Sequence, residues 1–152
     1  METTKQELVT NFVKAISEGN AAIFAGAGLS IPAGYVNWKE LLRPFAEKIK
    51  LDVDKENDLL SIAQYYKNED GNRQEVNNAI IREFTKDAKQ NINAEIITRL
   101  PICTYGTTNY DSIIEDSLEE NNRKADVKVE EDQLSQTISN RDAIVYKMHG
   151  SA

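Results

Sequence analysis

The spacing of apolar residues along the chain predicts helices that alternate with short strands. Amphipathic helices repeat apolar residues every three to four positions, so that one face can be buried. This spacing occurs in five stretches, at about 4–18, 38–49, 59–66, 76–84 and 94–99. A sixth helix is expected to start at 109–112, where Ser112 and Glu115 have the spacing of a capping box and Tyr110, Ile114 and Leu118 form an apolar face.

Three further runs are typical of strands, because they are short, rich in apolar or β-branched residues and bounded by turn residues. They cover 21–25, 102–107 and 143–148, and 126–129 is a candidate for a shorter extended segment. Continuous apolar runs indicate strands that are buried on both faces, as in parallel sheets. Strands separated by helices therefore predict an α/β fold, with a Rossmann-like parallel sheet and flanking helices.

The charge balance narrows the range of partners. The 152 residues include 18 Lys and Arg and 25 Asp and Glu, which gives a formal net charge of −7. Such a surface repels phosphate backbones and anionic lipids, so we expect neither nucleic-acid binding nor membrane binding. No apolar run approaches the roughly 20 residues that span a bilayer, and the N-terminal residues do not resemble a secretory signal. These features predict a cytoplasmic protein.

The chain contains one cysteine, Cys103, and one histidine, His149. A single cysteine excludes an intramolecular disulfide and a multi-cysteine zinc site, and a single histidine excludes HExxH and other two-histidine metal motifs. We therefore expect no metal, and we expect Cys103 to be a small buried hydrophobe of its strand.

The first candidate site is the turn that follows the first predicted strand. Gly26, Ala27, Gly28 and Ser30 lie between this strand and the next helix. Glycines allow a ligand to approach the backbone closely, and the amides of such a turn suit a pyrophosphate. The alternative is a tight turn whose small residues serve packing, because Ile31 stands where a GxGxxG motif has its third glycine and the lysine of a P-loop is missing.

Two more candidates follow the other predicted strands. Thr108, Asn109 and Asp111 come after the second strand, where ordinary helix capping is the alternative role. His149 follows the third strand, and a histidine with a reference pKa of about 6.5 can act as a base at neutral pH. Because the carboxyl ends of parallel strands meet at one edge of a sheet, where ligands bind, we expect all three candidates to lie together.

These candidates carry a resemblance to the Sir2 (sirtuin) family. Three segments match the family's signatures in the right order, and we call them the motif segments: 26–30 (Gly-Ala-Gly-Leu-Ser), 108–111 (Thr-Asn-Tyr-Asp) and 149–150 (His-Gly). The longer stretches 22–30, 34–42 and 145–150 are most similar to one branch, the bacterial Sir2-like NAD-cleaving effectors of anti-phage defence, such as that of the Thoeris system. The resemblance covers nearly the whole chain.

The resemblance implies a site that binds NAD⁺ and cleaves its nicotinamide–ribose bond. Gly26, Ala27, Gly28 and Ser30 would hold the phosphates, and Thr108 would belong to the same cofactor site. Asn109, with a catalytic role, and Asp111 would face the nicotinamide ribose and the carboxamide, and His149 would act as base toward a ribose hydroxyl or the attacking water. In the defence branch the products are ADP-ribose and nicotinamide, and NAD⁺ depletion leads to abortive infection.

The same resemblance implies partners beyond NAD⁺. In the defence branch a C-terminal domain binds an activator of the cyclic ADP-ribose type, and the proteins self-associate. Deacylating sirtuins instead carry a four-cysteine zinc module, and their loop after the glycine turn differs from 31–38 here. Hydrolysis is therefore favoured. An NAD-dependent protein-lysine deacylase and a nucleotide-binding or assembly module without turnover stay open as alternatives. Tyr35 and Trp38 are candidates to line the site, although Trp38 also lies on the apolar stripe of its helix.

The number of predicted strands suggests that the domain is incomplete. A dinucleotide-binding sheet has the strand order 3-2-1-4-5-6, and the runs found here correspond to strands 1–3, with strands 4–6 missing. We therefore expect residues 1–152 to be the N-terminal portion of a Sir2-type domain, without a second domain. We also expect an open sheet edge beside the first strand, and weak or no NAD⁺ cleavage by this chain alone.

Overall fold

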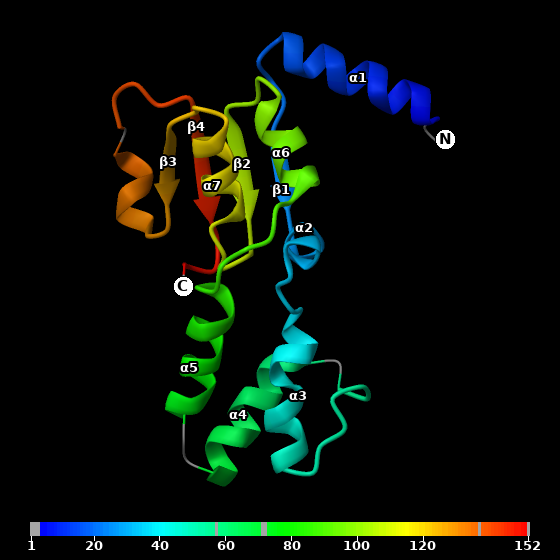
Figure 1. The fold of residues 1–152 in the computed structure, drawn as a ribbon, viewed down its shortest axis with the longest axis vertical. Helices are drawn as coiled ribbons and strands as arrows, with labels where there is room; N and C mark the ends of the chain where they lie inside the picture. Colours follow the sequence, from blue (N-terminus) through cyan, green and yellow to red (C-terminus); the bar gives the residue numbers. More distant parts are fainter. Residues whose placement is uncertain (1–3, 57, 71–72, 137, 152) are drawn as a thin grey trace. The chain divides into compact units, whose positions relative to one another are not determined.

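A computed structural model of the chain describes residues 4–56, 58–70, 73–136 and 138–151. Among these residues it contains the strands β1 (Ile23–Ala25), β2 (Thr104–Thr107), β3 (Ala125–Lys128) and β4 (Ala143–Lys147) (Figure 1). The helices are α1 (Lys5–Ser17), α2 (Ala27–Ser30), α3 (Trp38–Lys48), α4 (Leu59–Asp70), α5 (Arg73–Phe84), α6 (Ile92–Arg99) and α7 (Ile113–Glu120), with the 3₁₀ turns η1 (Ile31–Ala33) and η2 (Glu131–Ser135).

The chain divides into two compact units, which we describe separately. The sheet unit comprises Met1–Leu29 and Asn91–Ser151, and the helical unit comprises Ser30–Gln90. All strands lie in the sheet unit, in the order β1-β2-β4-β3, and all neighbouring pairs are parallel. The predicted α/β fold with a Rossmann-like parallel sheet and flanking helices is therefore confirmed, and β1 is an outer strand, as expected.

The sheet contains one strand more than the three runs predicted. The segment at 126–129, expected only as a short extended piece, corresponds to β3, which pairs with β4 in parallel. Its buried positions are Asp126 and Lys128. An edge strand whose inward positions carry charges lacks the apolar alternation by which a strand is recognised in a sequence.

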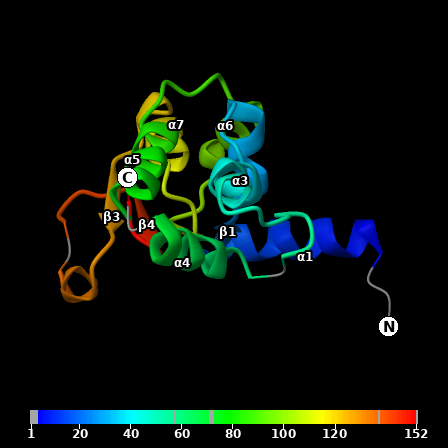
Figure 2. The ribbon, with the colours of Figure 1, turned by 90° about the horizontal axis from the view of Figure 1, so that it is seen from below.

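The core of the sheet unit lies between the sheet and two helices. Tyr105, Val145 and Leu118 are fully buried at its centre, with α6 and α7 on the same face of the sheet (Figures 1 and 2). The Tyr105 hydroxyl donates to the carbonyl of Ile97 in α6. A polar hydroxyl with a partner can be buried at little cost, so this tyrosine anchors α6 to β2.

The helix α1 forms as predicted, but its apolar face is not covered. Thr4 and Glu7 make a reciprocal capping box at its start. None of its residues is buried, and the exposed apolar side chains follow the helical spacing: Leu8, Val9, Phe12 and Val13. Local capping and spacing are sufficient to define this helix, whereas only Ile16, near its end, packs against the core of the sheet unit.

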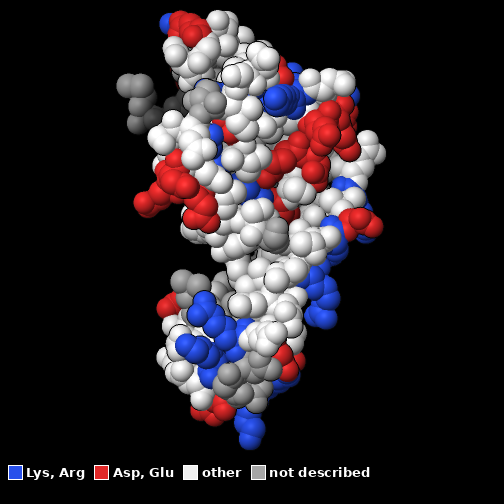
Figure 3. Space-filling model, turned by 90° about the vertical axis from the view of Figure 1, so that its left-hand side faces the viewer, with Lys and Arg blue, Asp and Glu red and all other residues white. Residues whose placement is uncertain are grey.

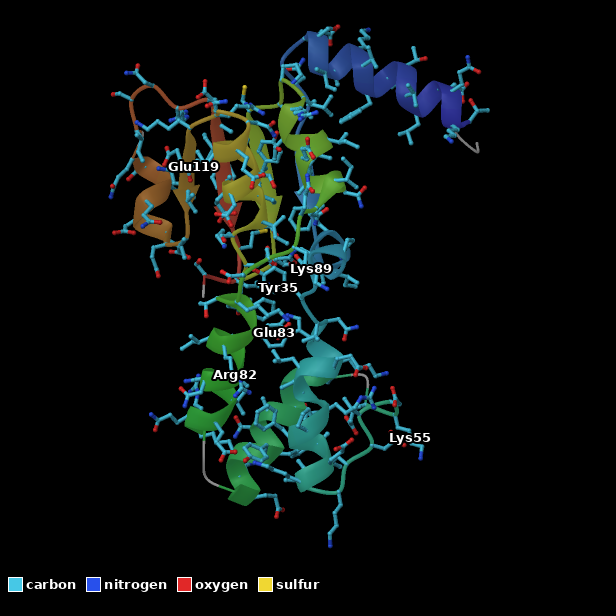
Figure 4. All side chains as sticks on the ribbon, in the orientation of Figure 1. Tyr35, Lys55, Arg82, Glu83, Lys89 and Glu119 are labelled. Atoms are coloured by element: carbon cyan, nitrogen blue, oxygen red, sulfur yellow. The ribbon has the colours of Figure 1, made fainter. Side chains whose placement is uncertain are left out.

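The helical unit is held by aromatic contacts between α3, α4 and α5. The Phe45 and Tyr66 rings meet edge to face at 5.0 Å, and Trp38 packs against Phe84 at 6.1 Å. Tyr35 stacks on the same Phe84 ring and donates its hydroxyl hydrogen to the carbonyl of Lys86. Figure 4 shows Tyr35 near Glu83 and Lys89. The rings of Tyr35 and Trp38, candidates to line the site, thus contribute to the core of this unit.

A buried ion pair secures the outer strand β3. Nζ of Lys128 lies 2.8 Å from Oδ1 of Asp126, and Arg141 lies 3.6 Å from the other carboxylate oxygen. The Ile138 amide donates to the same carboxylate. Lys128, chiefly, holds the pKa of Asp126 below its ordinary value of 3.8. Because the folded-state pKa is lowered, this contribution to stability is complete above about pH 4 and is lost as the pH falls through that pKa.

We predict that Lys128→Met lowers the free energy of unfolding by about 2 kcal/mol at pH 7. This lies between the value of a surface pair and that of a deeply buried pair, because β3 is an edge strand and Arg141 remains. The difference from the wild type should begin to shrink below about pH 4 and should disappear once the pH has fallen through the lowered pKa of Asp126, where this carboxyl is neutral. Urea unfolding at pH 7 and pH 3 measures it, with Lys124→Met as an exposed control. A loss of equal size at both pH values would contradict the assignment.

Candidate functional site

The register of the sheet brings the three motif segments to one edge. Ala25 pairs with Thr107, and Thr107 pairs with Lys147, so that β1, β2 and β4 end level with one another. The strands are parallel, so the residues that follow them leave the sheet on the same side: 26–28, 108–111 and 149–150. The expected arrangement at the carboxyl ends of the strands is thus present in the structure.

Asn109 connects the second motif segment to the first. Its side-chain amide donates to the carbonyl of Gly26, with Nδ2 and the oxygen 2.9 Å apart, and its backbone amide donates to Oγ1 of Thr107. Asn109 is buried, and a buried amide that is satisfied in this way holds its neighbours in a defined geometry. The turn after β1 is therefore fixed by a side chain from the loop after β2.

The two glycines of the first turn have open space beside them. A Cβ atom added to Gly26 or Gly28 would meet no atom within 4 Å. Packing within the protein therefore does not require small residues at these two positions. The space favours the other interpretation from the sequence, in which glycines let a ligand approach the backbone. Ala27 is exposed, and Ser30 lies at the end of α2, where the chain enters the helical unit.

Asp111 is buried in the loop between β2 and α7. Its Oδ1 accepts the backbone amide of Ile113, so its carboxylate satisfies one of the free amides at the start of α7. The predicted capping box of Ser112 and Glu115 is wrong, because Ser112 makes no side-chain cap and donates to Asp116 instead. Thr108 is half-buried at the start of the same loop.

Lys147 was not predicted as a site residue. It pairs with Glu115, the residue that the predicted capping box requires. Nζ of Lys147 lies 3.0 Å from Oε1 of Glu115. The lysine also donates to the backbone carbonyls of Tyr110 and Asp111, at 3.2 and 2.6 Å. A signal was present in the sequence: β4 reads Ala-Ile-Val-Tyr-Lys, and Lys147 continues the buried alternation of Ala143 and Val145.

His149 lies just beyond β4 and is exposed. The ladder between β2 and β4 extends to Met148, whose amide donates to the carbonyl of Thr107. The following Gly150 has φ +101°, a conformation that L side chains rarely adopt. Its Cβ position would lie 3.7 Å from the Tyr110 ring. The chain therefore turns sharply past His149 and returns toward the loop that carries Asn109 and Asp111.

Other parts of the described sheet unit offer no site for a metal ion or a pyrophosphate. Among the described residues, no group of three His, Cys, Asp or Glu side chains is placed to hold a metal ion. Cys103, expected to be buried within its strand, precedes β2 and is exposed, whereas its neighbour Ile102 is buried. A hollow on the sheet unit is lined by Glu115, Asp116 and Glu119 together with Arg123 and Lys124. Acidic side chains gather on the face of this unit drawn in Figure 3, and carboxylates repel a pyrophosphate.

A comparison with family models places residues 104–152 in a known domain. They match the SIR2-like domain, and this range holds two of the three motif segments. Over this range the chain is similar to a SIR2-like domain. None of the described helices is long and apolar enough to cross a membrane.

Similarity to curated relatives extends over nearly the whole chain. The chain is 56% identical over 143 residues to the NAD(+) hydrolase ThsA of Bacillus cereus (strain MSX-D12), which covers 93% of this chain and 30% of the relative. It is 50% identical over 151 residues to the NAD(+) hydrolase ThsA of Acinetobacter baumannii (strain 532279), which covers 99% of this chain and 31% of the relative. The chain thus spans just under a third of the length of these relatives.

We predict that Asn109→Ala loosens the turn after β1. The carbonyl of Gly26 would lose its side-chain donor, which should lower the free energy of unfolding by about 1–2 kcal/mol. Amide exchange should accelerate at 26–29, as followed by hydrogen exchange, and Asn93→Ala, at an exposed position of α6, serves as the control. Unchanged exchange at 26–29 would show that this hydrogen bond does not hold the turn.

Proposed function

We propose that the chain is the N-terminal part of the catalytic domain of an NAD⁺ hydrolase, which cleaves the nicotinamide–ribose bond to give nicotinamide and ADP-ribose. The observation that carries the proposal is the meeting of the three motif segments at one sheet edge, with Asn109 bonded to Gly26. The names of the relatives, NAD(+) hydrolases of similar sequence, support it.

Following the resemblance to the Sir2 family, we assign a part of NAD⁺ to each segment. The open turn at Gly26, Ala27 and Gly28, with Ser30 after it, would take the phosphates. Thr108, Asn109 and Asp111 would surround the nicotinamide ribose and the carboxamide. Cleavage passes through an oxocarbenium-like state, which is stabilised by polar groups already held in place. Hydrogen bonds to the backbone hold the side chains of Asn109 and Asp111 in place before any reaction begins.

His149 would act as the base. Its exposed position lets it reach a ribose hydroxyl or the attacking water, and imidazole is the side chain whose ordinary pKa suits proton transfer near neutrality. No metal is needed for this scheme. NAD⁺ depletion would then serve anti-phage defence of the Thoeris type in the cytoplasm by abortive infection, under control of a cyclic ADP-ribose-type activator bound by a further domain.

We predict that His149→Ala lowers NAD⁺ turnover by about 10²–10⁴-fold, the usual contribution of a general base. The variant is compared with the wild type in a protein that carries this chain together with the remaining length found in its relatives, and released nicotinamide is quantified. Glu119→Ala, an exposed position of α7, is the control and should keep full turnover. Undiminished turnover in His149→Ala would refute the assignment of the base.

The same assay separates the two alternatives. Nicotinamide release that depends strictly on an acylated peptide would indicate a protein-lysine deacylase. NAD⁺ binding by calorimetry, without nicotinamide release under any activator, would indicate a nucleotide-binding module. Release of nicotinamide and ADP-ribose from NAD⁺ and water alone supports hydrolysis.

Self-association belongs to the same proposal, and α1 offers a surface for it. Leu8 and Val13 are 63% and 59% exposed on its apolar face, and contiguous apolar surface of this kind is typical of protein interfaces. We predict that Val9→Glu combined with Val13→Glu shifts the protein to smaller species in sedimentation velocity, whereas Gln6→Glu on the same helix does not. A wild-type oligomer that stays intact in the double variant would exclude α1 from the interface.

A further inference from the structure

Lys147 occupies a position where a parallel strand normally carries an apolar side chain. Its side chain is 0% exposed, on the same face of β4 as the buried Ala143 and Val145. Burying an ammonium group is costly unless the charge is paired and its hydrogen-bond donors are satisfied. The partners of this lysine therefore have to compensate the full cost of its burial.

The partners of Lys147 match its donors. An ammonium group has three N–H donors, and among the described residues its Nζ lies within bonding distance of three oxygens. One belongs to Glu115, which supplies the opposite charge. The other two are the backbone carbonyls of Tyr110 and Asp111. Two of the three donors thus bind backbone carbonyls of one loop rather than a side chain.

That loop is the second motif segment. The two carbonyls follow Asn109 directly, and Asn109 in turn binds Gly26 of the first segment. Lys147 itself lies two residues before His149 of the third. A single buried ammonium group therefore ties the end of β4 to the loop after β2, and through Asn109 to the turn after β1. Without it, two loop carbonyls would lose their donor, which buried backbone groups rarely tolerate.

We propose that Lys147 is a positioning residue that holds the backbone of the 109–111 loop so that Asn109 and Asp111 face the substrate. It is fully buried, so it acts through the loop and does not touch NAD⁺. Glu115 neutralises its charge. The inference rests on the proposed function for its catalytic consequence, whereas its structural part, the ordering of the loop by Lys147, can be measured without NAD⁺.

The test removes the ion pair without leaving a lone buried charge. Lys147→Met alone would strand the carboxylate of Glu115, so the main variant is Lys147→Met with Glu115→Met, because a buried pair can be replaced by apolar side chains of similar size at little cost in stability. The matched control is Lys128→Met with Asp126→Leu, which removes the buried pair of β3 at a distance in sequence from the loop. Thermal unfolding shows whether each variant is folded.

Two measurements are made on the folded variants. Hydrogen exchange without NAD⁺ should be about tenfold faster at residues 109–113 in the Lys147 variant, because the loop opens locally, and unchanged there in the control. The kcat of nicotinamide release, measured in a protein that carries the chain with the remaining length of its relatives, should fall about 10²-fold, the effect of misplacing reacting groups by about 1 Å. The KM for NAD⁺ should change less than kcat.

The outcomes separate this inference from the proposed function. Unchanged exchange at 109–113 in the folded Lys147 variant would overturn the positioning role, whether or not the wild type cleaves NAD⁺. Faster exchange with unchanged kcat would also overturn it. A wild-type protein that releases no nicotinamide would instead overturn the proposed function, and faster exchange would then still support the ordering of the loop by Lys147.

Discussion

Strands β1, β2 and β4 end level with one another, and the backbone groups that leave the ladder at this edge must find other partners. Beyond the last bond, from Met148 to Thr107, no strand continues to supply donors to the loop after β2. Lys147 donates to two of its carbonyls, and Asn109 donates to that of Gly26. The side chains that satisfy this edge are thus the same ones that shape the candidate site, which couples the stability of the edge to the geometry needed for chemistry.

At the amino-terminal end of β2, a different cation, Arg123, binds the backbone carbonyls. The guanidinium of Arg123 donates to the carbonyls of Thr98, Leu100 and Ile102, before β2 begins. Its planar fork of five donors suits several carbonyls at once, and it remains partly exposed beside a carboxylate-lined hollow. Lys147, a compact charge, is fully enclosed instead. Arg123 also donates to the carbonyl of Asp142, directly before β4. β2 is therefore held at both ends by cations bound to carbonyls, and both cations connect it to β4.

The sequence predicts the features that depend on the spacing of apolar residues and fails where charged side chains are buried. Helical periodicity places the longer helices but not α2, which the sequence presents as a turn. Apolar runs place β1, β2 and β4, which is enough to bring Gly26, Asn109 and His149 to one edge. It misses β3 as a full strand, because Asp126 and Lys128 occupy the inward positions. It also assigns Glu115 to a capping box, whereas Lys147 pairs with it. In both cases a buried ion pair between residues that look like surface charges decides the structure, and no local pattern reports which charges will meet.

The candidate site divides into an ordered part and an exposed part. Hydrogen bonds to the backbone hold the side chains of Asn109 and Asp111, so these groups would need no rearrangement as charge develops in the proposed reaction. Gly26 and Gly28 leave space beside the backbone that the protein does not fill. His149 is exposed after the strand, next to the sharply turned Gly150. In the proposed reaction a base has to reach the substrate, whereas the loop that carries Asn109 and Asp111 has to stay in place. The exposed His149 and the buried Lys147, two residues apart at the end of β4, would serve these two requirements.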